Sequence, residues 1–206
     1  MGNEEQVFWK NGSLKGEGLY CPAQAMQGVV ICHPHPLMGG SMYNNVVQAV
    51  QEVFAAYGHA TLRFNFRGVG GSTGSYDEGR GEQQDIVSAC EFLKSRGIEQ
   101  VVLAAYSFGA WVACRLLAGG SYDAGDVVLI SPPDKYFDFT WPRQSTVVKL
   151  IICGDADMFC DAAALRQKAS QIQSEFVLLD ATDHFYSGRE LLLADCLKKY
   201  LSEKKA

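Results

Sequence analysis

An apolar strand that runs directly into Ser107, followed by a helix-forming segment, most constrains the fold of this 206-residue chain. Residues Gln100–Ala105 are typical of a strand buried on both faces, and Phe108–Ala118 has the Ala and Leu content of a helix. Ala105 and Gly109 keep both flanks of Ser107 small, which a serine that merely capped a helix would not need. The pattern predicts a sharp G-x-S-x-G turn, with alanine replacing the first glycine, and makes Ser107 the candidate nucleophile.

An acid and a histidine follow two later predicted strands. The run Val147–Cys153 ends in Gly-Asp-Ala-Asp, which makes Asp157 the candidate acid. Asp155 in the same turn and Asp134 after the preceding strand are the alternatives. His184, in the loop after the last predicted strand, is the candidate base. The order serine, acid, histidine is that of α/β-hydrolase triads and differs from the orders in the chymotrypsin and subtilisin folds.

Strand and helix patterns alternate along the rest of the chain. An Asn-Gly-Ser turn between Val7–Trp9 and Leu14–Tyr20 predicts an N-terminal hairpin. The remaining predicted strands are Gly28–Cys32, Ala60–Phe66, Val127–Ile130 and Phe176–Leu179, and the remaining helices are Met42–Tyr57, Glu82–Arg96, Asp161–Gln173 and Arg189–Leu201. Alternation predicts an α/β fold in one domain over residues 1–206, with a mostly parallel sheet of about seven or eight strands, helices on both faces and the antiparallel hairpin at one edge. Ligands of such sheets bind beyond the carboxyl ends of the strands, where all the candidate residues fall.

Several longer motifs point to a known family. They are His-Pro-His-Pro-Leu-Met-Gly-Gly-Ser-Met (33–42), Arg-Phe-Asn-Phe-Arg-Gly-Val-Gly-Gly-Ser (63–72), Gly-Glu-Gln-Gln-Asp (81–85), the serine turn and Asp-His-Phe. Over nearly its whole length the chain resembles the small, capless α/β hydrolases related to dienelactone hydrolases. The resemblance implies an α/β-hydrolase fold with Ser107 as nucleophile, Asp157 as acid and His184 as base.

The resemblance also implies two backbone amides that receive an oxyanion, those of Leu37 and Phe108. The His-Pro-His-Pro-Leu loop can be aligned one or two residues differently, so His35 and Met38 remain alternatives to Leu37.

Neither a metal nor a nucleotide cofactor is expected. His33 and His35 form a His-x-His pattern, but the sequence offers no convincing third ligand, since His59 lies in a turn before a strand. Residues Gly68–Gly74 faintly resemble a dinucleotide loop, yet Thr73 replaces the third glycine and no helix starts there directly. The histidines are expected to order the oxyanion loop, and the glycine-rich turn is expected to line the mouth of the site.

The connection Ser131–Ser145 is too short to hold a cap domain. We predict that its aromatic residues form an apolar wall or small lid that binds substrate, namely Tyr136, Phe137, Phe139 and Trp141. The alternative is that they pack on the protein's own surface.

Composition excludes several other classes of function. A formal net charge of −5 with both signs interspersed argues against a nucleic-acid-binding surface. The N-terminus is polar and acidic, unlike a signal peptide, and no apolar stretch is long enough to span a membrane, so we expect a cytoplasmic protein. Seven cysteines without a Cys-x-x-Cys pair are interpreted as reduced thiols, mostly buried.

These observations predict a serine hydrolase, specifically a carboxylesterase whose partner is a small-molecule substrate with a small or medium acyl group. A thioesterase or peptidase with the same triad is the enzymatic alternative. A binding protein that has kept the fold without catalysis is the alternative from another class. The oligomeric state stays open.

Overall fold

Eight strands form one sheet in the computed structural model, which describes residues 4–120, 122, 125–142 and 147–204. The sheet order is β1-β2-β4-β3-β5-β6-β7-β8. The pairs β1/β2 and β2/β4 are antiparallel, and all the other neighbouring pairs are parallel. The strands are β1 (Glu5–Asn11), β2 (Leu14–Cys21), β3 (Gln27–Cys32), β4 (Ala60–Asn65), β5 (Gln100–Tyr106), β6 (Val127–Ile130), β7 (Val148–Gly154) and β8 (Glu175–Leu179).

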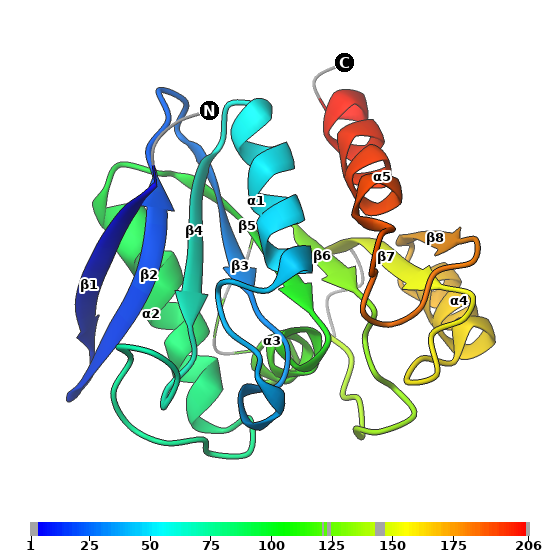
Figure 1. The fold of residues 1–206 in the computed structure, drawn as a ribbon, viewed down its shortest axis with the longest axis horizontal. Helices are drawn as coiled ribbons and strands as arrows, with labels where there is room; N and C mark the ends of the chain where they lie inside the picture. Colours follow the sequence, from blue (N-terminus) through cyan, green and yellow to red (C-terminus); the bar gives the residue numbers. More distant parts are fainter. Residues whose placement is uncertain (1–3, 121, 123–124, 143–146, 205–206) are drawn as a thin grey trace.

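Helices cover both faces of this sheet (Figure 1). Helices α1 (Asn45–Ala56) and α5 (Glu190–Glu203) lie together on one face, whereas α2 (Gly81–Ser95), α3 (Phe108–Ala118) and α4 (Ala162–Gln171) cover the other. A short 3-10 helix, η1 (Pro36–Met38), follows β3. The predicted α/β architecture with an antiparallel hairpin at one edge is confirmed.

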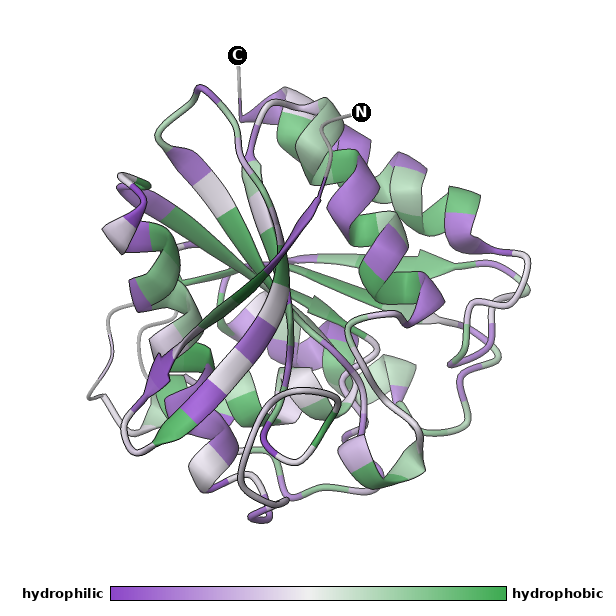
Figure 2. Cartoon of the chain, turned by 60° about the vertical axis from the view of Figure 1, so that its left-hand side comes forward, coloured by the Kyte–Doolittle hydropathy of each residue, from purple (hydrophilic) through white to green (hydrophobic). Residues whose placement is uncertain are grey.

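The central strands bury side chains on both faces, and Figure 2 shows them as hydrophobic. In β5, Leu103 and Ala105 pack toward α2 and α3, whereas Ala104 and Tyr106 pack toward α1 and α5. Successive side chains of a strand point to opposite faces, so a strand between two helical layers must be apolar throughout. This is why the run before Ser107 reads as uninterrupted apolar sequence.

Most predicted element boundaries differ from the structure by one or two residues, but α1 begins three residues later than the predicted Met42. The Asn44 side chain caps α1 by accepting hydrogen bonds from the amides of Val46 and Val47. The Met42 amide instead donates to Asn65 Oδ1 at 2.9 Å. The predicted helix includes residues 42–44, but these side-chain hydrogen bonds set its start at Asn45.

The glycine-rich segment 68–74 is fixed to the sheet by a buried carboxylate. Glu17 Oε2 accepts hydrogen bonds from the Gly71 amide at 2.6 Å and from Asn65 Nδ2 at 2.7 Å. Burial alone would raise the pKa of Glu17, but these hydrogen bonds hold it below its usual value. The Ser72 hydroxyl donates to the Asn65 carbonyl at 2.7 Å. The loop is therefore held by contacts within the chain.

The motif 81–85 anchors the start of the same loop. Asp85 accepts hydrogen bonds from the Arg67 guanidinium at 2.8 and 3.1 Å and from the Arg67 amide at 2.9 Å. This ion pair joins the end of β4 to α2, so Arg67 orders the start of the loop.

Residues 131–147 connect β6 to β7, and positions 143–145 of the predicted aromatic segment lie outside the described residues. Among the helices that the structure describes, none is long and apolar enough to cross a membrane.

Candidate active site

Ser107 occupies a strained turn between β5 and α3. Its φ of 54° and ψ of −118° lie in a region that residues other than glycine rarely adopt. The turn is fixed because the Ser107 amide donates to the Ile130 carbonyl at 2.9 Å, while the Ser107 carbonyl accepts from the amides of Ala110 and Trp111. The backbone therefore presents the serine at the carboxyl end of the central strand, as predicted.

Small residues on both sides of Ser107 allow this turn to pack tightly. A Cβ at Gly109 would lie 2.7 Å from the Cys32 Cβ and 3.0 Å from the carbonyl oxygens of Cys32 and His33. The carboxyl end of β3 therefore leaves no room for a side chain there. Ala105 is fully buried in the core, where its methyl group replaces the first glycine of the motif.

Ser107, His184 and Asp157 form a hydrogen-bonded chain. The Ser107 Oγ lies 2.9 Å from His184 Nε2, and His184 Nδ1 lies 2.9 and 2.8 Å from the two carboxylate oxygens of Asp157. A carboxylate can only accept, so Nδ1 carries the ring proton and Nε2 accepts from the serine hydroxyl. All three residues are buried. The structure thus brings together three residues that are separated by up to 77 positions in sequence.

The surroundings of Asp157 favour its ionised form. Burial alone would raise the pKa of Asp157, but hydrogen bonds and charge from His184, with further hydrogen bonds from Ser131 and the Phe159 amide, lower it. The Phe159 amide donates to Oδ1 at 2.9 Å, and the Cys160 thiol lies 3.2 Å from Oδ2. The carboxylate is held from several directions and cannot rotate freely.

The other acidic residues have different partners. Asp155 accepts from the Thr182 amide at 3.2 Å, and Asp134 accepts from the Asp161 amide at 2.7 Å. Asp161 caps α4 by accepting from the amides of Ala163 and Ala164. Of the three acids considered from the sequence, Asp157 is the one whose carboxylate contacts His184.

A second layer of hydroxyl groups holds the histidine loop, and sequence reasoning missed it. The Tyr106 hydroxyl donates to the His184 carbonyl at 2.7 Å, and the Ser131 hydroxyl lies 2.9 Å from the Tyr186 hydroxyl. Burial raises the pKa values of both tyrosines, so their hydroxyl groups stay protonated. Ser131 directly follows β6, a position that could have marked it, but nothing in the sequence indicates its partners.

His33 is a structural residue of the loop that follows β3. It is fully buried; its Nδ1 donates to the Pro34 carbonyl at 2.6 Å, and its Nε2 accepts from the Phe66 amide at 3.0 Å. Burial lowers its pKa to about 4, so the ring is neutral at pH 7. Both ring nitrogens are engaged, and the ring ties the loop after β3 to the end of β4.

The candidate oxyanion amides come from two segments. Phe108 is the first residue of α3, where an amide has no carbonyl acceptor within its own helix. The Leu37 amide donates to His35 Nδ1 at 3.2 Å, and the Met38 amide donates to the His35 carbonyl at 3.0 Å. The His35 amide has no acceptor among the described residues. Of the three positions considered in this loop, His35 therefore has the uncommitted amide.

The aromatic residues after β6 separate into two groups. Tyr136 contacts Phe159 at 4.9 Å between ring centroids, and Phe159 contacts His184 at 4.5 Å. Phe137 stacks on Trp111 at 4.4 Å, next to the rings of His35 and Phe108. Of these two predicted substrate-binding residues, Tyr136 therefore lies near His184 through Phe159, and Phe137 lies near Phe108, the residue after Ser107.

The other two predicted residues, Phe139 and Trp141, have no ring contact with His184 or Phe108 in the described structure. They contact each other at 5.5 Å and pack against the core beneath α4. The alternative interpretation, burial against the fold itself, describes them better, because the segment folds back toward α4 after Phe137.

Cys153, Asp157 and Cys160 form a buried group whose ligating atoms lie within 4.8 Å of one another. Within the described residues it is the one group that could supply three metal ligands. However, Asp157 is engaged by His184, and the Cys160 thiol lies 3.1 Å from the Pro132 carbonyl. Hydrogen bonding with Cys153 and burial raise the pKa of Cys160, which favours the protonated thiol over a metal-binding thiolate.

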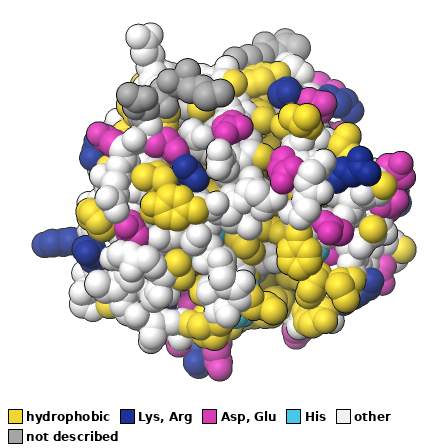
Figure 3. All heavy atoms as spheres, viewed as in Figure 1, with side chains coloured by type: hydrophobic (Ala, Val, Ile, Leu, Met, Phe, Trp, Pro, Cys, Tyr) yellow, Lys and Arg dark blue, Asp and Glu magenta, His cyan; other side chains and the backbone are white. Residues whose placement is uncertain are grey.

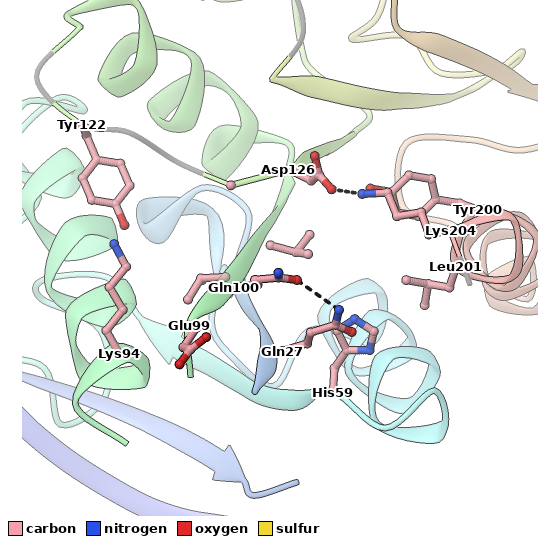
Figure 4. Close-up of a pocket in the computed structure, with 13 residues that line it drawn as sticks. Gln27, His59, Lys94, Glu99, Gln100, Tyr122, Asp126, Tyr200, Leu201 and Lys204 are labelled. Atoms are coloured by element: carbon pink, nitrogen blue, oxygen red, sulfur yellow. Dashed lines mark hydrogen bonds and ion pairs between the residues drawn. The ribbon is translucent and has the colours of Figure 1, made fainter. Parts of the chain in front are cut away.

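A cavity of about 590 Å³ lies at the opposite, amino-terminal edge of the parallel strands (Figure 4). Its lining includes Gln27 and Gln100, which begin β3 and β5, and Asp126, which precedes β6. Lys94 and Lys204 also line it, and Lys204 forms an ion pair with Asp126. None of the residues predicted as functional from the sequence lies there.

Comparison with known proteins gives this site a family context. The sequence model of the Alpha/beta hydrolase family matches residues 29–145, more than half of the chain. The chain therefore belongs to the α/β hydrolase family.

Several solved structures and a sequence relative match nearly the whole chain. An alpha-beta serine hydrolase homologue from Coxiella burnetii is 30% identical, with a TM-score of 0.85 and 98% of each chain covered. A serine hydrolase without lid from Xanthomonas campestris is 28% identical, with a TM-score of 0.86 over 98% of this chain and 94% of its own. An uncharacterized protein from Rickettsia prowazekii is 29% identical over 95% of this chain and 88% of its own length. The capless fold inferred from sequence agrees with the Xanthomonas structure, which is described as lacking a lid.

Proposed function

We propose that the protein is a serine hydrolase that cleaves carboxylic esters with small or medium acyl groups. The observation that carries this proposal is the 2.9 Å contact between Ser107 Oγ and His184 Nε2. The other ring nitrogen of the same histidine, Nδ1, contacts the Asp157 carboxylate. A serine hydroxyl is a weak nucleophile unless a base removes its proton, and this contact supplies the base. The description of the Coxiella and Xanthomonas proteins as serine hydrolases supports the same chemistry.

The reaction forms and then breaks an acyl-enzyme. His184 Nε2 takes the Ser107 proton while Oγ attacks the carbonyl carbon, and Asp157 stabilises the imidazolium that results. As the tetrahedral adduct collapses, the bond to the alcohol breaks and the alcohol receives the proton from His184. A water molecule then gives a proton to His184 and attacks the acyl carbon. Collapse of this second adduct releases the carboxylic acid and returns the proton to Ser107.

Backbone amides stabilise the negative charge on the carbonyl oxygen. The Phe108 amide is available because it begins α3, and the positive end of the helix dipole lies there. From the loop after β3, we propose the His35 or the Leu37 amide, the latter only after it releases His35 Nδ1. Loss of one such donor costs about 2.7–4 kcal/mol in a comparable enzyme.

Fluorophosphonate labelling tests this proposal directly, because the probe reacts with activated serines. Wild-type protein is expected to be labelled and Ser107→Ala is not. Ser95→Ala is a suitable control, since the Ser95 hydroxyl donates to the Phe92 carbonyl within α2, and this variant is expected to label like the wild type. Absence of labelling in folded wild-type protein, or labelling that survives in Ser107→Ala, would overturn the assignment of the nucleophile.

A further inference from the structure

Exposed apolar side chains are concentrated around the candidate active site. Eleven large hydrophobic residues of the described chain are exposed. Seven of them, with 55% to 79% of their surface exposed, lie on the loops that follow the parallel strands or on the first turn of α5. One of the seven, Tyr43, lies beside a charged group, with the Arg63 guanidinium 5.8 Å from its ring centroid, and the other six have no such neighbour among the described cation–ring contacts. We call these six the apolar rim: Leu37, Met38, Tyr136, Met158, Phe185 and Leu191. At the amino-terminal edge of these strands, Met26 is the one comparable residue among those described.

The apolar rim is continuous with the candidate active site. Phe159 contacts Tyr136 at 4.9 Å, Phe185 at 6.2 Å and His184 at 4.5 Å. On the other flank, Leu37 and Met38 belong to η1, whose capping residue His35 lies against Phe108. Figure 3 shows the hydrophobic side chains gathered low on this face, over the loops drawn at the lower ends of the strands in Figure 1.

The position of the rim restricts what can cover it. A group of large exposed apolar side chains on one edge of a protein marks a surface that binds an apolar partner. A protein bound there would cover Ser107 and block access of an ester to it. The surface of an aggregate of ester molecules would instead bring substrate to the serine. The connection between β6 and β7 is too short to form a cap over the rim.

Charge restricts the partner further. The chain carries a net charge of −5, but the charges beside the rim have both signs: Asp155 and Asp183 are exposed close in sequence to Met158 and Phe185, and Lys135 and Arg189 are exposed close to Tyr136 and Leu191. A face that carries both signs, on a chain with a net negative charge, does not attract an anionic surface, and an uncharged or zwitterionic surface does not repel it.

We propose that the apolar rim seats the protein on the surface of aggregated, uncharged or zwitterionic ester amphiphiles, such as a micelle, an emulsion or a bilayer. The proposal rests on the proposed esterase function and narrows its substrate class to esters presented from such a surface. The rim is permanently exposed, so seating requires no opening of a lid.

Binding to vesicles is the first test, with Ser107→Ala protein and phosphatidylcholine vesicles in a sedimentation assay. The background variant prevents hydrolysis during the measurement. Adding Met158→Glu or Leu191→Glu is expected to lower the partition coefficient by about tenfold each, because a charge must then enter the apolar contact. Met26→Glu, a similarly exposed residue at the opposite edge, is expected to leave partitioning unchanged. Circular dichroism confirms that each variant is folded.

Ester hydrolysis by wild-type protein is the second test, with tributyrin below and above its solubility limit. The rate is expected to rise steeply once an emulsion forms. Failure of Ser107→Ala to bind vesicles, an equal loss in Met26→Glu, or a rate that saturates smoothly through the solubility limit would overturn the proposal.

The two proposals fail in different ways. If the protein labels with fluorophosphonate and hydrolyses dissolved tributyrin but neither binds vesicles nor acts faster on an emulsion, the result supports the esterase function and contradicts binding to a lipid surface. Protein that binds vesicles through the rim but never labels at Ser107 has the surface without the esterase function.

Discussion

The polar groups at the two ends of the parallel strands differ in burial: the candidate catalytic groups at the carboxyl ends are buried, and those lining the cavity at the amino ends are largely exposed. At the carboxyl ends, Ser107, His184 and Asp157 are buried in fixed contact, on loops rimmed by apolar side chains. At the amino ends, a cavity of about 590 Å³ is lined by exposed polar side chains such as Lys94 and Gln100, and the latter bonds Gln27 at 3.0 Å. Helices α1, α3 and α5 begin at the carboxyl edge, where their free amides and positive dipole ends favour developing negative charge. The size of a cavity is therefore a poorer indicator of an active site than a set of buried polar groups in fixed contact.

Replacing the acid at the carboxyl edge should give the largest effect. Asp157→Asn is expected to lower kcat about 10⁴-fold, because an amide at this position favours the wrong tautomer of His184. Asp155→Asn, whose carboxylate bonds the Thr182 amide, is the matched control and should stay within about twofold of wild type. Steady-state hydrolysis of a dissolved ester measures both. The opposite pattern would move the acid to Asp155 and leave the class of enzyme unchanged.

Acidification should lower the stability of the protein because of His33, a buried histidine at the same edge. The pKa of His33 is about 4 in the folded protein, against 6.5 in the unfolded chain, so the unfolded chain binds more protons between these values. Stability therefore falls as the pH drops through this window, by about 2 kcal/mol between pH 7 and pH 5. Urea unfolding at the two pH values measures the change.

The variant His33→Leu isolates this contribution. It is expected to be less stable than wild type at pH 7, since the Pro34 carbonyl and the Phe66 amide lose their partner. It should, however, lack the 2 kcal/mol decrease on acidification, to within about 0.5 kcal/mol. An equal decrease in both proteins would show that His33 is not a buried neutral group.

A smaller effect is expected from the thiol that contacts the acid. Cys160→Ala should lower kcat about fivefold with little change in KM, because Asp157 Oδ2 loses a neighbour at 3.2 Å. Cys160→Ser should restore most of the loss, since a hydroxyl also donates. Cys196→Ala, a half-buried cysteine on α5, is the control and should match wild type in ester hydrolysis. Equal activity of the alanine and serine variants at position 160 would assign Cys160 to packing alone.

Variants at the amino edge should have the smallest effect and are the most direct way to break the comparison. Lys94→Ala and Lys204→Ala are expected to change kcat/KM by less than about twofold, and removal of the partly exposed Lys204–Asp126 pair should cost at most about 1 kcal/mol of stability. Ester hydrolysis and urea unfolding measure the two quantities. A tenfold loss of activity in either variant would connect the amino-edge cavity to catalysis.

Sequence patterns predicted the parts of the protein that local physics determines. The bounds of α3 and β6 agree with the prediction, because each has a strong apolar signal and clear ends. Ser107 could be found because a strand, a turn and a helix coincide there. The geometry of the turn after β7 brings Asp157 rather than Asp155 to His184, a distinction that two carboxylates two residues apart cannot show in sequence.

Other parts depend on how distant loops meet. The contact of Ser131 with Tyr186 spans 55 positions, and no local pattern indicates it. Phe137 and Phe139 lie in the same short segment and both pack against the core, yet Phe137 also contacts the Phe108 ring next to Ser107, whereas Phe139 contacts Trp141. The side on which each aromatic residue falls is set by the bend of the loop, which α3 fixes through a hydrogen bond from Trp111 Nε1 to the Asp138 carbonyl at 3.1 Å.

The chain order of Ser107, Asp157 and His184 also has a consequence during synthesis. The serine turn leaves the ribosome 77 residues before the histidine that would activate it. Domains fold as units, so a nascent or prematurely ended chain that stops before β8 carries a serine without its base. Under the proposed function, reactivity toward esters therefore requires synthesis to have passed His184, and chains that stop before β8 are expected to be inert.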